Sequence, residues 1–316
     1  MSMITIVRYE ASMAARWDEF ARMSRNATFL HQRGYMDYHS DRFEDCSLIA
    51  LHDGKWCAIL PACIAGDTLY SHRGLTYGGW LLPLKHFDVT LMIGVMDAAC
   101  EWMRAQGLKR MVYKAVPHIY HHYPCEEDLY ALFRQHAVLT EANISTTIDL
   151  TCPLPLDRGN KSGANAARKA GIIVGESDSW EEYWQLLSSL LDQRYDTRPV
   201  HTLEEIHLLH DRFPGNIRLY TASLDGELLA GVVMYLSAPV AHCQYIGASP
   251  RGKENKALTL LFEHLIGLYS GMEEYRYFDF GISNEDHGRY LNEGLVRQKS
   301  RLGGRGIVYN TFEICL

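Results

Sequence analysis

The sequence predicts an α/β protein built from two tandem modules, each a mixed, mostly antiparallel sheet flanked by helices. The chain has 316 residues, more than the ~250–300 at which one apolar core stops growing. Each half contains an Asp-Gly dipeptide between two apolar runs, Asp53-Gly54 and Asp225-Gly226. Such a dipeptide is a strong hairpin signal, because glycine accepts the positive φ of a tight turn. In both halves a glycine-containing stretch, an amphipathic helix and another strand follow the hairpin in the same order, which indicates a duplicated unit.

The first module is predicted to span residues 1–152. Its central helix carries apolar residues at helical spacing on one face and is closed by Gly107. The residues of this face are Met92, Met96, Ala99 and Met103. The other elements expected here are helices around 13–23 and 126–135, a hairpin within 47–63 and a strand at 110–116.

The second module is predicted to span residues 153–316. It follows a linker, Thr151–Leu156, whose two prolines disfavour helix. A basic segment at 158–171 comes next, and Thr202 and Glu205 then form a capping box that opens a helix. The remaining elements expected are a hairpin at 217–236, a helix at 258–268 closed by Gly271 and a strand at 276–282.

The composition predicts a folded cytoplasmic protein. Hydrophobic residues make up 47% of the chain, which excludes a disordered chain. The most apolar helical stretch, 89–103, contains Asp97 and Glu101 and is shorter than the ~20 residues that a bilayer requires, so no membrane span is expected. The N-terminus lacks the pattern of a signal peptide. The eight cysteines include no C-x-x-C pair, so we expect reduced, mostly buried thiols.

A histidine-rich loop is the one metal-like feature of the sequence. It contains His118, His121 and His122 between Pro117 and Pro124, and Cys125 follows directly. The spacing fits no helical ligand pair, and we expect no metal there.

The order of hairpin, glycine-containing loop, helix and strand resembles the GNAT acyltransferase fold. Its duplication resembles the FemAB-like branch of that superfamily, which carries two GNAT modules. Three segments resemble motifs of the branch: Ala164–Ile172, Tyr277–Gly281 and Asn292–Gly304. The resemblance implies an N-acyltransferase or aminoacyltransferase that moves an acyl group from an activated, phosphate-bearing donor to an amine, with its site in the cleft between the modules.

The donor stays open between acyl-CoA and aminoacyl-tRNA. Simple acetyl-CoA-dependent members of the superfamily hold pyrophosphate on a glycine-rich loop at a helix N-terminus. The corresponding stretch here, Arg251–Ala257, has Glu254 where that loop has glycine. The resemblance implies a small-molecule or peptidoglycan-like amine as acceptor, and tRNA as a possible donor carrier. The alternatives are an acetyl-CoA-dependent N-acetyltransferase of simple GNAT type and a catalytically inactive binding module of the same fold.

Three residues are the catalytic candidates. The resemblance matches Lys299 to a lysine of the family's C-terminal segment, as a cation for the developing oxyanion. Asp279 lies mid-strand between two phenylalanines. A carboxylate there is costly unless it is paired or functional, so Asp279 is expected to be either a catalytic base or the buried partner of an arginine. His201 precedes a predicted helix and is expected to be either a catalytic base or a surface histidine. His242 and the loop after Gly281 are weaker candidates.

The residues expected to hold the donor come from three places in the second module. A splayed strand, implied by the resemblance, contributes Tyr245 and Gly247, and the following loop contributes Arg251, Gly252 and Asn255. Two basic stretches contribute Arg168 and Arg301. Such stretches in a chain of net charge −7 indicate a phosphate-rich ligand or a solvated surface.

Overall fold

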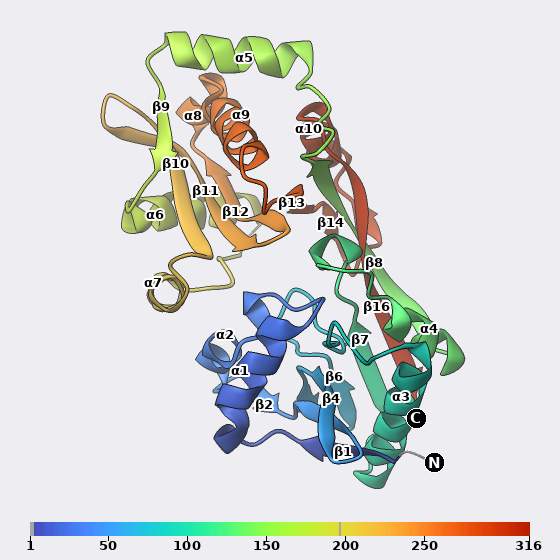
Figure 1. Cartoon of the computed structure of the whole chain (residues 1–316). Helices are drawn as coiled ribbons and strands as arrows, with labels where there is room; N and C mark the ends of the chain where they lie inside the picture. Colours follow the sequence, from blue (N-terminus) through green and yellow to red (C-terminus); the bar gives the residue numbers. More distant parts are fainter. Residues whose placement is uncertain (1–2, 196) are drawn as a thin grey trace. The chain divides into compact units, whose positions relative to one another are not determined.

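The structure is a computed structural model that describes residues 3–195 and 197–316. It forms two compact units, each with sheets flanked by helices, which confirms the predicted fold class (Figure 1). Unit 1 comprises Met1–Ile144, Asn284–Tyr290 and Val308–Leu316. Unit 2 comprises Ser145–Ser283 and Leu291–Ile307. The predicted modules, divided at residue 152, are defined as two copies of a duplicated segment, whereas the two units are defined by their compactness. The division at residue 152 therefore stays a prediction.

In its described residues, unit 1 contains two sheets and four α-helices. The first sheet has the order β1 (Ile4–Arg8), β3 (Leu48–His52), β4 (Lys55–Leu60). The second has the order β2 (Glu44–Asp45), β5 (Cys63–Ala65), β6 (Thr68–Tyr70), β7 (Arg110–Lys114) and the C-terminal half of β16 (Arg305–Cys315). The helices are α1 (Ala14–Met23), α2 (Arg33–Met36), α3 (Val89–Ala105) and α4 (Glu127–Arg134). The predicted stripe of α3 is fully buried in the core of this unit.

Unit 2 is a single sheet with helices on both faces. Its strand order is the C-terminal part of β8 (Val138–Asp149), β13 (Tyr277–Ile282), β12 (Val240–Ala248), β11 (Glu227–Ser237), β10 (Ile217–Leu224) and β9 (Ile173–Glu176). The helices are α5 (Arg158–Lys169), α6 (Trp180–Tyr195), α7 (Leu203–Arg212), α8 (Pro250–Glu254), α9 (Ala257–Ser270) and α10 (Glu293–Arg301). A separate two-stranded ladder joins β14 (Asn284–Glu285), which belongs to unit 1, to β15 (Tyr290–Leu291), of which only Leu291 belongs to unit 2.

Both predicted hairpins are confirmed. Asp53 and Gly54 have φ of 48° and 77°, and Asp225 and Gly226 have φ of 52° and 82°. Positive φ at both central residues defines the type I′ turn that matches the twist of paired strands. At the ends of the two central helices, Gly107 is left-handed with φ of 77°, whereas Gly271 caps α9 with φ of −86°. Both helices therefore end at the predicted glycine, the second without a left-handed conformation.

The two units repeat one β-α-β arrangement. In unit 1, β6 and β7 pair in parallel and α3 connects them. In unit 2, β12 and β13 pair in parallel, with α8 and α9 in their connection. The strand that follows β7 along the chain, β8, pairs with β13, and the last strand, β16, pairs with β7. The final strands of the two repeats are thus exchanged, which is why unit 1 contains the C-terminus.

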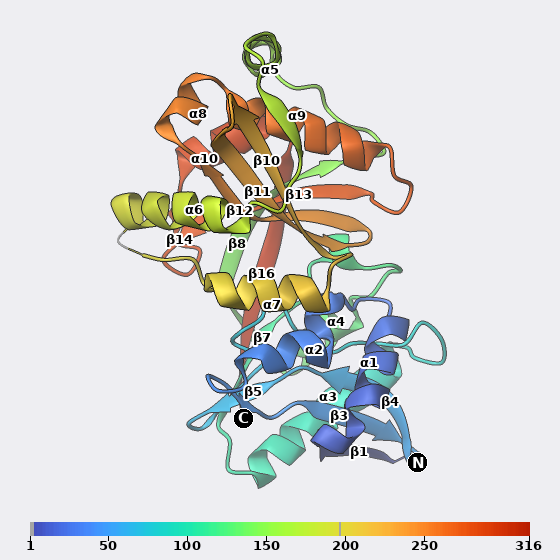
Figure 2. The same ribbon diagram turned by 90° about the vertical axis from the view of Figure 1, so that its left-hand side faces the viewer.

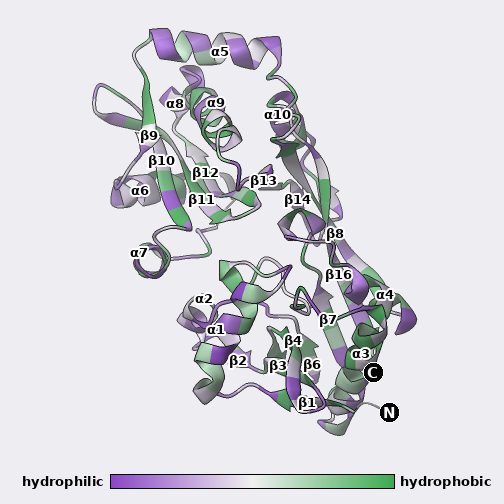
Figure 3. Cartoon of the chain, in the orientation of Figure 1, coloured by the Kyte–Doolittle hydropathy of each residue, from purple (hydrophilic) through white to green (hydrophobic). Residues whose placement is uncertain are grey.

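The two faces of the unit 2 sheet differ in their cover. Helix α9 packs on one face and encloses the apolar core of the unit, including Phe278 and Phe280. Helix α6 lies against β11 and β12 on the other face (Figure 2). Helix α5 packs against α9, burying only Ala164 and Ala167, and is otherwise hydrophilic (Figure 3).

Two further findings concern helices and cysteines. Within the described residues, no helix combines the length and apolarity needed to cross a membrane. Six cysteines are buried, and Cys152 and Cys315 are exposed.

Candidate active site

A row of polar side chains crosses four neighbouring strands of unit 2. Asp279 on β13 stands beside Thr147 on β8 and beside His242 on β12, and His242 stands beside Tyr235 on β11. Residues next to each of them along the strands belong to the core under α9. Because side chains alternate between faces, the whole row lies on the opposite face, which α6 also covers.

Asp279 is the fully buried centre of this row. Its Oδ1 accepts hydrogen bonds from Ser145 Oγ at 2.5 Å and Thr147 Oγ1 at 2.6 Å, and its Oδ2 lies 2.7 Å from His242 Nδ1. Burial alone would raise the pKa of Asp279, but the hydrogen bonds from His242, Ser145 and Thr147 outweigh burial and lower it. The structure shows a histidine, His242, as a charge partner of Asp279, and the buried arginine partner considered from the sequence stays a prediction.

The hydrogen bond to Asp279 fixes the tautomer of His242. An ionised carboxylate only accepts hydrogen bonds, so the proton must sit on Nδ1 of His242. Nε2 of the neutral ring is then an acceptor, which is the arrangement of a general base held by a buried acid. The His242 side chain is 12% exposed, so the dyad is close to the surface.

Strand β12 diverges from β13 just after His242. The parallel ladder joins Val240–His242 to Tyr277–Asp279, while β12 continues to Ala248. Opposite β11 the ladder has a bulge, because Val233 pairs with Tyr245 and Met234 with Cys243. The extra residue turns Tyr245 to the same face as His242. The sequence resemblance implied this divergence, and the dyad lies at its base.

His201 and Tyr245 form a second polar pair on this face. His201 is buried, and its Nδ1 lies 2.5 Å from the Tyr245 hydroxyl, which also accepts from the His201 backbone N–H at 3.3 Å. Trp184 of α6 donates its indole N–H to the His201 carbonyl at 3.3 Å. The expectation of a surface histidine at 201 is wrong, and its burial comes from contacts with α6 and β12 that are distant in the sequence.

Lys299 is buried on α10 and holds the end of β13. Its ammonium group donates to the carbonyls of Gly281 at 2.7 Å and Ile282 at 2.9 Å, and to Ser283 Oγ at 3.0 Å. Burial lowers its pKa to about 8, although the nearby Asp279 carboxylate acts to raise it. An ammonium has three donors, and the strand end takes all three.

The loop residues expected to hold the donor make internal contacts. Arg251 pairs with Glu227 of the hairpin, and the Asn255 side chain donates to the Arg251 carbonyl at 2.9 Å. The Gly252 backbone N–H donates to Ser249 Oγ at 3.0 Å, and a Cβ on Gly252 would stand 2.1 Å from the Leu229 carbonyl oxygen. The glycine thus permits close packing of α8 on β11.

The other predicted donor residues lie apart from one another. Gly247 faces α6, where a Cβ would contact Leu190 and Tyr183. Arg168 on α5 pairs with Glu263 of α9. Arg301 at the end of α10 pairs with Asp157 through Nε at 3.5 Å. The structure therefore brings Lys299, Asp279 and His242 together, with His201 and Tyr245 on the same face, and separates Arg168 and Arg301 from them.

Ser145 and Thr147 are the site residues that the sequence did not single out. They face Asp279 only because β8 pairs with β13, and no local pattern marks that pairing. Among the described residues, no three histidine, cysteine or acidic side chains gather as metal ligands. In the histidine-rich loop, His121 Nε2 lies 3.0 Å from the Val116 carbonyl, and burial lowers its pKa to about 4.

Comparison with known proteins supports the fold and the type of domain. Residues 160–289 match a family model described as an acetyltransferase (GNAT) domain, which includes the Asp279–His242 dyad. No curated protein sequence matches the chain.

Several solved structures share the fold over nearly the whole chain. FemX superposes with a TM-score of 0.70 at 11% identity, covering 98% of this chain and 97% of that one. L-PGS from Bacillus licheniformis gives 0.63 at 12% identity, covering 94% and 90%. The C-terminal domain of a protein assigned as a lysylphosphatidylglycerol synthetase from Agrobacterium fabrum gives 0.62 at 13% identity, covering 95% and 92%. These likenesses show that the chain shares its fold with the three proteins over most of its length.

Proposed function

We propose that this chain, a FemAB-like acyltransferase of the GNAT superfamily, transfers an acyl or aminoacyl group from an activated donor to an amine, with His242 as the general base. The observation that carries the proposal is the Asp279–His242 dyad at the point where β12 leaves β13. Neighbours of the same fold include a protein named for the synthesis of lysylphosphatidylglycerol, a product of aminoacyl transfer. A cytoplasmic location stays a prediction from the sequence.

The chemistry needs a base because the acceptor is charged at neutral pH. An alkyl amine with a pKa near ~10.4 is neutral in about one part in a thousand at pH 7. The ammonium first loses one proton to solvent, and Nε2 of His242 would take a second proton as the neutral nitrogen attacks the acyl carbonyl carbon. The C–N bond forms, the bond from the carbonyl carbon to the donor oxygen or sulfur breaks, and the proton held by His242 passes to that leaving atom.

The base role considered for His201 is given to His242 instead. The Nδ1 atom of His201 already contacts the Tyr245 hydroxyl inside a buried cluster. His242 has a buried carboxylate behind it and a partly exposed ring. Lys299 would act as a positioning residue, since its three donors hold the backbone that ends beside His242.

The contacts of α8 favour a donor other than coenzyme A. Ser249, Glu227 and Leu229 already engage the residues that would have to face pyrophosphate. An aminoacyl-tRNA donor is therefore preferred over acetyl-CoA. The acceptor is proposed only as an amine, of a small molecule or of a peptidoglycan-like peptide.

The test is a transfer assay with both donors. Mass spectrometry should detect an amide product when an aminoacyl-tRNA mixture and candidate diamines are supplied, and calorimetry should detect no binding of coenzyme A at millimolar concentration. A product formed only from acetyl-CoA would establish the simple N-acetyltransferase instead. Tight substrate binding without turnover by any donor would establish a binding module.

A further inference from the structure

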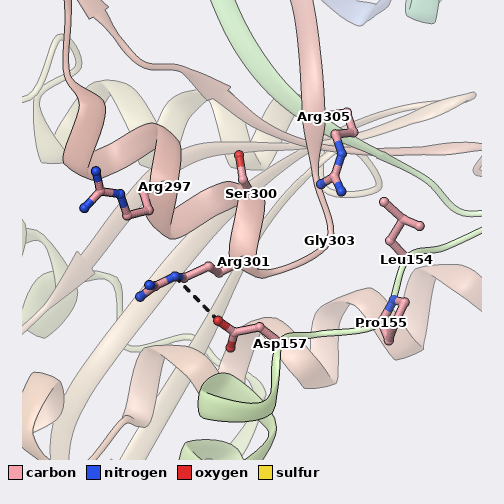
Figure 4. A pocket seen from close by; sticks show the side chains of 8 residues that line it. All are labelled: Leu154, Pro155, Asp157, Arg297, Ser300, Arg301, Gly303 and Arg305. Atoms are coloured by element: carbon pink, nitrogen blue, oxygen red, sulfur yellow. Dashed lines mark ion pairs between the residues drawn. The ribbon is translucent and has the colours of Figure 1, made fainter.

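A basic cavity lies at the end of α10, on the opposite side of that helix from the buried Lys299. Its volume is about 430 Å³, within the ~300–1,000 Å³ typical of small-molecule sites. Figure 4 shows the lining, which comes from the linker before α5, from α10 and from the start of β16. The lining residues are Leu154, Pro155, Asp157, Arg297, Ser300, Arg301, Gly303 and Arg305.

The sequence places three arginines on this cavity by two local devices. Arg297 and Arg301 are four residues apart on α10, so they share a helix face with Ser300. Gly303 then turns the chain with φ of 103°, and a Cβ there would stand 2.6 Å from the Leu154 carbonyl. Only glycine permits this close turn, which brings Arg305 back to the same cavity.

The linker wall is fixed to α10. The Asp157 backbone N–H donates to the Arg301 carbonyl at 3.0 Å. The Asp157 carboxylate caps α5 through the Asn160 N–H at 2.7 Å and pairs with Arg301 at 3.5 Å. The two walls of the cavity are therefore tied together by hydrogen bonds without any ligand.

The charge of the cavity is unbalanced. Asp157 is the single acidic residue of its lining, against three arginines, although the chain as a whole carries −7. In the part of the chain that the structure describes, Arg297 makes no ion pair, and Arg305 donates to the Gly304 carbonyl at 2.7 Å. Guanidinium groups gathered in this way attract an anion and suit the geometry of phosphate.

We propose that this cavity binds a phosphate monoester or diphosphate group. The excess of two positive charges on one cavity matches a group with about two negative charges, which a phosphate monoester carries near pH 7. A phosphodiester linkage carries one, so a nucleic-acid backbone fits the charge less well. Ser300 supplies a neutral donor beside the arginines, and Leu154 and Pro155 supply an apolar wall. That the group belongs to a substrate of the transfer reaction rests on the proposed function.

The test measures binding without turnover, on the full chain. Isothermal titration with inorganic pyrophosphate should give saturable binding at low salt. In Arg297→Gln and in Arg305→Gln the Kd for pyrophosphate should rise by about tenfold, because each variant loses one charged hydrogen-bonding partner of the anion. Arg134→Gln on α4 of unit 1 removes the same charge outside the cavity and should leave the Kd within about twofold.

Each other outcome has a defined meaning. An absence of pyrophosphate binding at millimolar concentration, or equal losses in all three variants, would overturn the proposal. Dimethyl phosphate binding as tightly as pyrophosphate would overturn the assignment of a doubly charged group. RNA binding that pyrophosphate does not displace would assign the surface to RNA and also overturn it. The arginines are exposed, so unchanged circular dichroism should accompany the variants. Pyrophosphate binding in a protein without transfer activity would contradict the proposed reaction and leave the anion site standing.

Discussion

His242 Nδ1 lies 2.7 Å from Oδ2 of Asp279, on two parallel strands that separate directly after this contact. The pairing places a fully buried carboxylate behind a histidine whose ring is partly exposed. A buried carboxylate without partners is costly, and here three hydrogen bonds keep it charged. The hydrogen bond between the two residues thus stabilises the buried charge of Asp279 and also orients the His242 ring as a general base requires.

Replacing His242 by glutamine should abolish most of the transfer activity. Glutamine can still donate to Asp279 but cannot take a proton from the amine, so kcat/KM should fall by ~10²–10⁴-fold. Transfer assays at pH 7 measure the loss. His207→Gln on α7, a partly exposed histidine paired with Glu181, is the control and should keep the activity of the unchanged protein. Full activity in His242→Gln would remove His242 from the mechanism.

Lys299→Met should destabilise unit 2. The change leaves the carbonyls of Gly281 and Ile282 and the Ser283 hydroxyl without their charged donor, which should cost about 2–4 kcal/mol. Denaturant titration at pH 7 measures the loss. Arg297→Met on the same helix, with an exposed side chain, is the matched control and should stay within about 0.5 kcal/mol. Equal stability of the two variants would show that the tether contributes nothing.

The same lysine should make stability depend on pH above neutrality. Its pKa is about 8 in the folded protein against 10.5 for the unperturbed group. Between these values the unfolded chain binds more protons, so the free energy of unfolding should rise with pH, by about 3 kcal/mol across the window. Comparing the unchanged protein with Lys299→Met from pH 7.5 to 10.5 isolates this contribution. A difference that stays constant with pH would contradict the lowered pKa.

The sequence predicted those parts of the fold that depend on local signals. Two Asp-Gly turns, the buried stripe of α3 and the repeated order of elements were sufficient for the fold class. The exchange of β8 and β16 could not be predicted, because the partner of a strand depends on contacts more than a hundred residues away. The bulge that turns Tyr245 toward α6 has no marker in the local sequence for the same reason.

The candidate site was predicted in part. Because a charged residue between Phe278 and Phe280 is costly to bury, the sequence predicted a structural or catalytic role for Asp279. Its partner could not be chosen, because His242 faces it only through the register of β12 and β13. The likeness of Arg251–Ala257 to a phosphate-binding loop predicted where this segment lies in the fold but not what its residues contact. Gly252 allows close packing on the Leu229 carbonyl.

That packing role predicts the effect of alanine at two glycines. Gly252→Ala would bring a Cβ to 2.1 Å from the Leu229 carbonyl, and such overpacking should cost ~1–3 kcal/mol or more. Gly267→Ala in α9 has open space around the new atom and should stabilise the protein by ~0.5–1 kcal/mol through helix propensity. Thermal unfolding of the two variants checks the contrast. A stable Gly252→Ala protein would return this glycine to a ligand-binding role.

The thiols offer a test of burial in both units. Cys152 and Cys315 are exposed, and the other six cysteines are buried. Burial raises the pKa of Cys57 and Cys100 to about 11, and the thiolate is the reactive form. Titration with a disulfide reagent at pH 8 should therefore show two fast thiols in the native protein and eight after unfolding. Cys152→Ser should remove one of the fast pair. More than two fast thiols would show that one of the cores opens readily.

The His201–Tyr245 pair should stabilise the protein without taking part in proton transfer. Tyr245→Phe removes the hydroxyl that contacts His201 Nδ1 at 2.5 Å, and leaving a buried group unpaired costs ~1–3 kcal/mol. His201→Gln should cost a similar amount, and the double variant should lose less than the sum, with a coupling energy of ~0.5–3 kcal/mol. Tyr130→Phe on α4, half exposed, is the control for the loss of a hydroxyl. Because the proposed base is His242, His201→Gln should keep most of its transfer activity. A large loss there, with full activity in His242→Gln, would assign the base to His201, so the two histidine variants together decide between the two positions.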